Sequence, residues 1–232
     1  MKKNKKITIK FFLNKSVKPV KEGNTLTYPL YMLLTYNRRS TMLRCHYGKY
    51  YKDMKSIEKI HYPGFQKFEE RIIIKTIQYQ LAKQGEKFNI KGIGIPYEKY
   101  CIGIDHLFDK YMKSILRDCL MRLEPFEYFN ALDWNKDNVT FDTLFEMASK
   151  LYGDFEKLAA KMIGYDMEAY LVFMKLYQSS FYQYTFPTVI EWLDKSAIED
   201  YKTKLQLIYK KNEKLINENI LLIQRIVDSA LN

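Results

Sequence analysis

Hydrophobic and polar residues alternate along the first fifty residues of the chain, a pattern typical of β-strands. A loop rich in lysine, glycine and asparagine precedes the second run of alternation, and Asn37-Arg38-Arg39 supplies a turn after it. The pattern therefore predicts a small three-stranded antiparallel sheet, with strands at 7–13, 28–36 and 40–46.

Alternation also assigns the side chains of each predicted strand to two faces of the sheet. A small sheet with one apolar face must bury that face, so we expect a helix later in the chain to cover it. The apolar side chains that share a face are Ile7, Ile9, Phe11 and Leu13 in the first strand and Leu30, Met32 and Leu34 in the second. The other sets that share a side are Thr8, Lys10 and Phe12; Tyr31, Leu33 and Thr35; and Ser40, Met42, Arg44 and His46.

From residue 66 the apolar residues take the spacing of an amphipathic helix. The first predicted helix covers 66–84 and ends at Gly85, because glycine favours the position after a helix C-terminus. A glycine-rich extended segment follows. We predict an α+β fold: a basic three-stranded module at 1–60, a helix and linker at 61–95, and a larger all-α domain at 96–232. Its helices are expected near 97–123, 141–152, 154–163, 166–184, 187–193 and, as one long C-terminal helix, 197–230.

The last predicted helix carries a 3-4 repeat of the kind that forms a coiled-coil seam. Two asparagines fall at equivalent positions of this repeat, and a seam asparagine can specify register and a dimeric state. The apolar stripe is wider than a two-stranded seam, however, so a core helix of a bundle explains the pattern equally well. If the seam exists, we expect a homodimer held by Leu205, Asn212, Leu215, Asn219 and Leu222.

Positive charge is concentrated at the start of the chain. The whole chain has a net charge of +11. Residues 1–60 hold fifteen lysines and arginines against three acidic residues, a net charge of +12, and residues 61–232 hold twenty-three against twenty-four, a net charge of −1. A concentration of positive charge in one segment indicates a polyanionic partner, most commonly nucleic acid and less commonly an anionic membrane surface.

The compartment is expected to be reducing and cytoplasmic. Three cysteines form no CxxC pair, and an odd number argues against a disulfide scaffold. The basic N-terminus has an apolar run interrupted by Lys10 and no small-residue cleavage site, unlike a signal peptide. No window approaches the ~20 apolar residues of a membrane span, so we expect a soluble protein without a membrane partner.

Residue patterns that carry catalysis are scarce. None of His46, His61 and His106 lies in the spacing of a metal-binding motif, and the chain has no phosphate-binding P-loop. Cys101 and His106 lie five residues apart near two aspartates, but a helical cysteine is most often a small core residue. The sequence predicts that the protein is not an enzyme and holds no metal or cofactor.

The opening stretch resembles the arm-type DNA-binding domain of tyrosine recombinases (integrases) from mobile elements of Bacteroidetes-like bacteria. The segments Pro29-Leu30-Tyr31-Met32 and Leu34-Thr35-Tyr36-Asn37 match the second strand of that domain. Arg39 stands at its basic end, and Gly23 and Gly48 match its loop glycine and the glycine after its third strand. The resemblance covers roughly the first fifty residues. It implies a three-stranded sheet that lies in the DNA major groove.

The chain departs from the recombinase pattern in three places. Leu33 stands where the family usually has an arginine, and Arg38 replaces the glycine of its Asn-Gly turn. The hairpin must therefore use another turn type or hold Arg38 at positive φ. No histidine is followed three residues later by arginine, as the recombinase catalytic half requires. The resemblance implies DNA binding without strand cleavage.

Two functions compete at this point. In the first, the chain is a non-catalytic accessory or regulatory DNA-binding protein of a phage or integrative mobile element. In the second, the helical domain of such a protein binds a host or virion protein, and the basic strands have no nucleic-acid role. Outward-facing side chains of a sheet can read bases while flanking cations neutralise phosphates. The residues expected to bind double-stranded DNA are Lys10, Tyr31, Thr35, Arg38, Arg39, Arg44 and Lys49.

Overall fold

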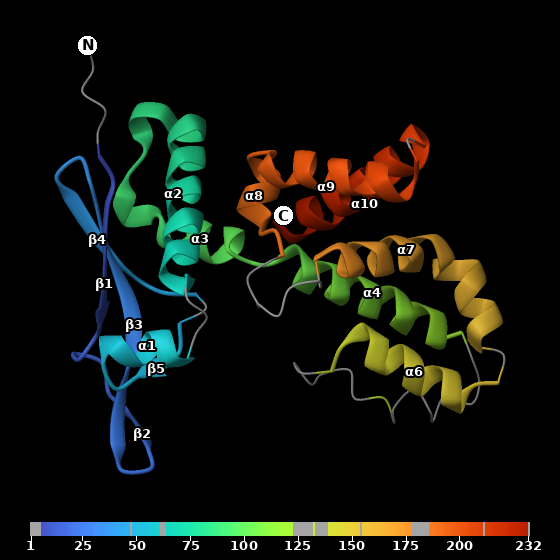
Figure 1. Cartoon of the computed structure of the whole chain (residues 1–232), viewed down its shortest axis with the longest axis horizontal. Coiled ribbons are helices and arrows are strands. Elements are labelled where there is room, and N and C mark those ends of the chain that lie inside the picture. The colour runs from blue at the N-terminus through green and yellow to red at the C-terminus, as the bar shows by residue number, and fades with distance from the viewer. Residues whose placement is uncertain are drawn as a thin grey trace. The chain divides into compact units, whose positions relative to one another are not determined.

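The computed structural model describes residues 6–46, 48–60, 64–122, 132, 139–153, 155–177, 186–210 and 212–231. The chain forms two compact units (Figure 1). The N-terminal unit combines Met1–Ile102 with Thr188–Ala197, and the helical unit combines Gly103–Pro187 with Ile198–Asn232. These units do not follow the expected segments 1–60, 61–95 and 96–232, because a short segment from late in the sequence belongs to the N-terminal unit.

The predicted α+β fold is confirmed, with five strands in place of three. Strand β3 is central, because each of the other strands pairs with it in antiparallel orientation. The two additional strands have three and two residues, too few for alternation to reveal them. The strands are β1 (Thr8–Leu13), β2 (Val20–Glu22), β3 (Thr25–Tyr36), β4 (Arg39–Arg44) and β5 (Tyr50–Tyr51).

Two tight turns set the register of the sheet. Asn37 and Arg38 both have positive φ, 50° and 62°, which is the φ pattern of a type I′ turn. The hairpin therefore keeps the turn that Asn-Gly usually makes and holds an arginine in the left-handed region. At the other hairpin, Gly23 has a φ of 60° and supplies the positive value at no steric cost.

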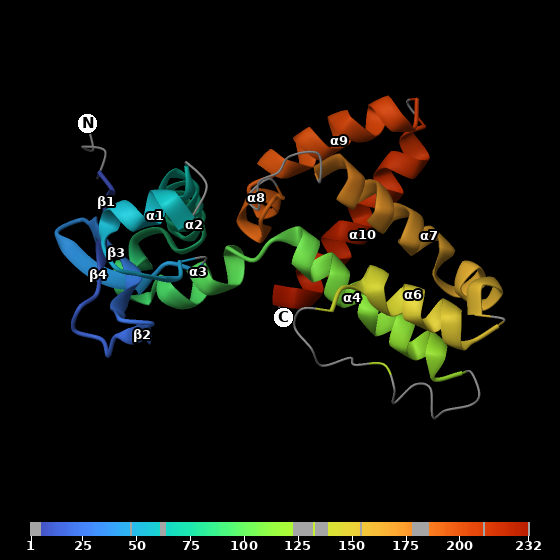
Figure 2. The same ribbon diagram turned by 60° about the horizontal axis from the view of Figure 1, so that its bottom comes forward.

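One face of the sheet is buried beneath helical segments. Leu30, Met32 and Leu34 have no exposed surface. The 3₁₀ helix η2 (Ile90–Gly92), which follows η1 (Gly85–Lys87), contacts β3 and β4. Helix α2 (Phe65–Gln84) lies beside the sheet in both views, and α1 (Met54–Ile60) and α3 (Gly94–Tyr100) complete this part of the unit (Figures 1 and 2). The prediction that a downstream helix covers the apolar face is confirmed.

A returning segment, Thr188–Ala197, completes the N-terminal unit. Its helix α8 (Val189–Leu193) contacts α2 and α3 and buries Trp192 to 1% exposure. Two ion pairs join it to α2: Arg71 Nε lies 3.1 Å from Glu191 Oε1, and Lys75 pairs with Asp194.

The ion pair between Lys75 and Asp194 should make stability depend on acid pH. Partial burial disfavours the charged form of Asp194, but hydrogen bonds from Lys75 and Ser196 outweigh it and hold the pKa of this carboxyl below its ordinary value. A depressed folded pKa stabilises the protein above the unfolded value, about 3.9 for aspartate, and this stabilisation is lost as pH falls through the folded pKa. We expect Asp194→Asn to lower the free energy of unfolding by less than about 1 kcal/mol at neutral pH, because the pair is partly screened by solvent.

Chemical denaturation across acid pH checks this prediction, since the difference between wild type and Asp194→Asn should shrink below about pH 4. Glu146→Gln is the matched control: Glu146 pairs with Lys150 at 2.6 Å on an exposed helix surface, and its loss should change nothing measurable. A difference for Asp194→Asn that stays constant with pH would contradict the assignment.

The helical unit is built around helix α4, which contacts α6, α7 and α10 (Figure 2). Its core includes Phe108, whose ring centroid lies 5.4 Å from that of Tyr170 and 5.7 Å from that of Phe173. None of the helices in the described ranges combines the length and apolarity needed to cross a membrane. The helices are α4 (Ile104–Leu120), α6 (Phe141–Leu151), α7 (Phe155–Tyr177), α9 (Ser196–Ile208) and α10 (Glu213–Leu231).

Two predictions for the helices before α8 were wrong. The single helix expected at 97–123 is divided into α3 and α4, with Gly103 in extended conformation at the start of α4. Conversely, the helices expected at 154–163 and 166–184 are joined in α7, which continues through Gly164, and residues 178–184 lie outside the described ranges. Asp166 was expected near a helix start, but it accepts a hydrogen bond from Tyr111 Oη at 2.8 Å. Packing on α4 therefore overrides the weak local signal for a break.

The chain does end in a helix, α10, but the prediction of one continuous helix at 197–230 is wrong, and with it that of a continuous dimer seam. Lys210 has a φ of 46° and separates α9 from α10. Asn212 caps the start of α10, where its Oδ1 accepts a hydrogen bond from the Leu215 N–H at 3.4 Å. Asn219 is buried, and its Oδ1 lies 3.4 Å from Tyr201 Oη. Leu205 and Leu222 are buried as well, whereas Leu215 is half-buried and Asn212 is exposed, so three of the five predicted seam residues pack inside the unit.

Candidate nucleic-acid interface

The face of the sheet opposite the buried one carries three rows of side chains from β1, β3 and β4. Strand register aligns Thr8 with Thr35 and Ser40 at the hairpin end of the sheet. The middle row is Lys10, Leu33 and Met42, and the third row is Phe12, Tyr31 and Arg44. We call these nine residues the open face. This register confirms the sets that alternation predicted for this face of the three strands, except for His46, which lies beyond the end of β4.

Each row of the open face offers different chemistry. In the first row the hydroxyls of Thr35 and Ser40 lie 2.8 Å apart and share a hydrogen bond. In the third row the rings of Phe12 and Tyr31 lie 6.1 Å apart between centroids. The Arg44 guanidinium lies 5.2 Å from the centroid of the Tyr50 ring, which holds this cation at the edge of the face.

The cations on and around the open face are available to a ligand. Strands β1, β3 and β4 contain no acidic residue. In the described part of the chain, none of the five predicted cations forms an ion pair with a carboxylate, and all five are exposed. These are Lys10, Arg38, Arg39, Arg44 and Lys49.

The predicted DNA-binding residues are brought together only in part. Lys10, Tyr31, Thr35 and Arg44 lie on the open face, as the register above shows. Arg38 lies at the tip of the β3–β4 hairpin.

Two predicted residues lie elsewhere. Arg39 pairs with Tyr36 as the first residue of β4, and alternation places it on the opposite face, beside the Tyr36–Phe88 ring contact. We predicted from the sequence a three-residue turn that included Arg39, whereas the hairpin has a two-residue turn. Lys49 precedes β5, where its backbone N–H donates to Tyr51 Oη at 3.0 Å.

Six further residues of this surface were not named as site residues from the sequence. Five of them follow from the alternation already described, combined with strand pairing: Thr8, Phe12, Leu33, Ser40 and Met42. Tyr50 lies in the two-residue strand β5, which carries no pattern of its own. Met42 is 58% exposed, so the centre of the open face includes a large apolar side chain in contact with solvent.

A buried polar cluster supports the end of β4 from beneath the sheet. Tyr97 Oη donates to the buried carboxylate of Glu69, and the backbone N–H of His46 donates to Tyr97 Oη at 3.2 Å. Burial, followed by the nearby Glu69 carboxylate, raises the pKa of the Cys45 thiol above its ordinary value. This thiol is protonated at neutral pH, so the cluster positions the strand and does not supply a nucleophile.

Two of the other residues considered for reactive chemistry, Cys101 and Asp109, have structural partners, and the Cys101 thiol donates to the Glu98 carbonyl oxygen at 3.4 Å. Cys101 belongs to the N-terminal unit and is buried, whereas His106 belongs to the helical unit. Asp109 accepts a hydrogen bond from the Phe141 N–H at 2.7 Å and pairs with Lys113 at 2.8 Å. Asp133 and Asp137, two carboxylates four residues apart that read from the sequence as solvated caps, lie outside the described residues. Among the residues the structure describes, no group of three or more His, Cys, Asp or Glu side chains could hold a metal ion.

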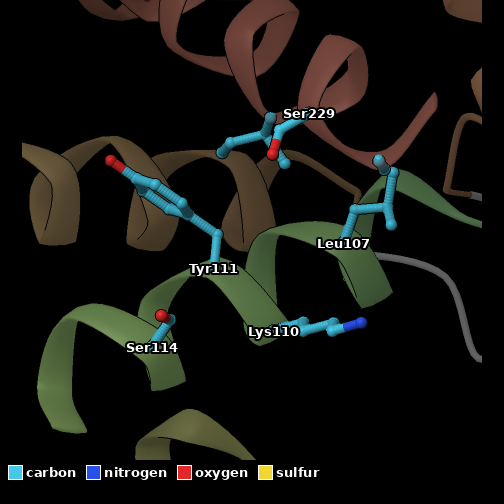
Figure 3. Close-up of a pocket in the computed structure, with 7 residues that line it drawn as sticks. Leu107, Lys110, Tyr111, Ser114 and Ser229 are labelled. Carbon is cyan, nitrogen blue, oxygen red and sulfur yellow. The ribbon is translucent and has the colours of Figure 1, made fainter. Parts of the chain in front are cut away.

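The helical unit has a shallow hollow of about 250 Å³ between α4 and α10 (Figure 3). Its lining combines apolar side chains such as Leu107 with the Lys110 ammonium and the hydroxyls of Ser114 and Ser229. The hydroxyl of Tyr111 is engaged by Asp166. This mixed lining does not favour one class of ligand.

Comparisons of the chain with protein-family models, with curated proteins and with solved structures found no match.

Proposed function

We propose that this chain is a non-catalytic DNA-binding protein, with an accessory or regulatory role in a phage or integrative mobile element. It binds double-stranded DNA by laying the open face of its sheet in the major groove. The observation that carries this proposal is a solvent-exposed sheet face that contains no acid and whose neighbouring cations have no carboxylate partner in the described residues. The +12 charge of residues 1–60 agrees with a polyanionic ligand.

The dimensions of the open face suit the major groove. Neighbouring strands lie about 4.8 Å apart, so the axes of β1 and β4, on either side of β3, are about 10 Å apart. The major groove is about 12 Å wide and presents a distinct pattern of donors, acceptors and methyl groups for each base pair. Lys10 and Arg44, on the outer strands, can reach base edges or the groove walls.

The hairpin tip is suited to the DNA backbone. Arg38 projects from a turn in which both central residues have positive φ, and it is exposed. A guanidinium offers several donors in one plane and binds phosphate oxygens well. Such contacts position the protein on the duplex, while side chains of the open face contact the bases. Arg39, on the opposite face, has a smaller role in this arrangement.

Removing two cations from the proposed interface should weaken DNA binding and reduce its dependence on salt. We expect the double variant Arg38→Gln, Arg44→Gln to bind a duplex at least about tenfold more weakly than the wild-type chain. If both cations contact phosphates, the slope of log K against log salt should fall by about 1.8. Fluorescence anisotropy with a labelled duplex at several salt concentrations measures both quantities.

Lys83→Gln, Lys87→Gln is the matched control. It removes the same charge from the same unit, at exposed positions at the end of α2 and in η1. Its effect on affinity should be small. The proposal is wrong if the wild-type chain shows no salt-dependent binding to duplex DNA, or if the two double variants weaken binding equally.

A further inference from the structure

Two of the three residues in the middle row of the open face are apolar, which a surface that binds only phosphates does not require. Leu33 on β3 pairs with Met42 on β4, and Met42 is 58% exposed. Phe12 and Tyr31 extend this apolar area into the next row. Lys10 and Arg44 flank it on the outer strands, and Thr35 and Ser40 place two hydroxyls at its other side.

The major groove contains one apolar group that such a surface can contact. This group is the C5 methyl of thymine, which distinguishes A·T pairs from G·C pairs. Directly opposed side chains on neighbouring strands have Cβ atoms about 5 Å apart, while successive bases rise about 3.4 Å along a strand. Leu33 and Met42 are therefore spaced to contact the methyl groups of two neighbouring base pairs.

We infer that the open face selects thymine-rich duplex DNA through contacts of Leu33 and Met42 with thymine methyl groups. The inference rests on the proposed function and adds its sequence preference. Lys10 and Arg44 then bind acceptors or phosphates on either side of the apolar centre. The hydroxyls of Thr35 and Ser40, which both donate and accept, tolerate several base edges and add little discrimination of their own.

Uracil-substituted DNA tests the inference without changing the protein. A pool of random-sequence duplexes is prepared twice, once with thymine and once with uracil, which differs only by the missing methyl group. We expect the full wild-type chain to bind the thymine pool about tenfold more tightly, the value for burying roughly two methyl groups. Replacing cytosine by 5-methylcytosine in the uracil pool should restore part of the affinity, because it returns methyl groups to the groove.

The double variant Leu33→Ala, Met42→Ala assigns the preference to these two residues. It should bind the thymine and uracil pools equally, with its fold verified by circular dichroism. Ile95→Ala, at a position in α3 that is 73% exposed and outside the open face, should retain the wild-type preference. Equal binding of both pools by the wild-type chain, with binding still sensitive to salt and to the Arg38 and Arg44 substitutions, would overturn this inference and leave the proposed function standing. Absence of binding to either pool would overturn both.

Discussion

A fragment that ends at residue 60 will not fold, although it contains every strand of the sheet. Leu30, Met32 and Leu34 are completely buried in the whole chain, and the segments that contact this face, such as η2, come after residue 60. Without those segments, three large apolar side chains face water on a sheet too small to be stable alone. Circular dichroism and amide chemical-shift dispersion of fragment 1–60 should show an unfolded chain.

Fragment 1–102 is the matched comparison, because it restores α2, η2 and α3 but lacks the returning segment with α8. We expect it to show native-like shift dispersion and to unfold at lower denaturant than the full chain. A cooperative unfolding transition in fragment 1–60 would contradict this account and would restore the 1–60 module that the sequence predicted.

Alternation alone recovered the long strands and their faces, because a period of two residues is a local property of a strand. It could not supply the length of the turn. The sequence counted Asn37, Arg38 and Arg39 as turn residues, whereas the structure has a two-residue turn with both φ values positive. Arg39 is therefore the first residue of β4, and alternation places its side chain on the face opposite that of Ser40, Met42 and Arg44.

The sequence could not predict which segments of the chain make up the N-terminal unit. Thr188–Ala197 joins that unit through Arg71–Glu191 and Lys75–Asp194, pairs separated by more than a hundred residues. Neither partner carries a local pattern that names the other. The sequence likewise could not predict that the cations near the open face lack carboxylate partners in the described residues, because an ion pair depends on which carboxylate the fold brings close.

The division between α9 and α10 did have a local signal. Asn212 followed by Glu213 fits a helix N-terminus, with a side-chain oxygen at the cap and an acid in the first turn. The same asparagine also fits a coiled-coil seam, and the continuous apolar repeat favoured that interpretation. An asparagine can cap a helix or occupy a seam position, so the repeat was compatible with two helices or with one continuous helix. The positive φ of Lys210 shows that the chain forms two helices here.

The largest effect of a single substitution should come from Trp192. We expect Trp192→Ala to lower the free energy of unfolding of the N-terminal unit by about 3–5 kcal/mol, since it removes from α8 the largest fully buried side chain among the described residues. Because α8 contacts α2 and α3, their amides should lose protection in hydrogen exchange. Hydrogen exchange of the full chain measures the loss unit by unit.

Two controls separate this loss from a general weakening of the chain. Trp192→Phe keeps an aromatic ring in the site and should cost less, because it leaves a smaller cavity. Leu221→Ala, at a position 60% exposed on α10, should leave the protection of α2 and α3 unchanged. If Trp192→Ala leaves amide protection in α2 unchanged, α8 contributes little to the stability of the N-terminal unit. The ion pairs of the returning segment with Arg71 and Lys75 are then surface contacts that do not stabilise the unit. If protection falls in α2 and α3 but not in α7, the ten residues Thr188–Ala197 stabilise the unit that contains the open face.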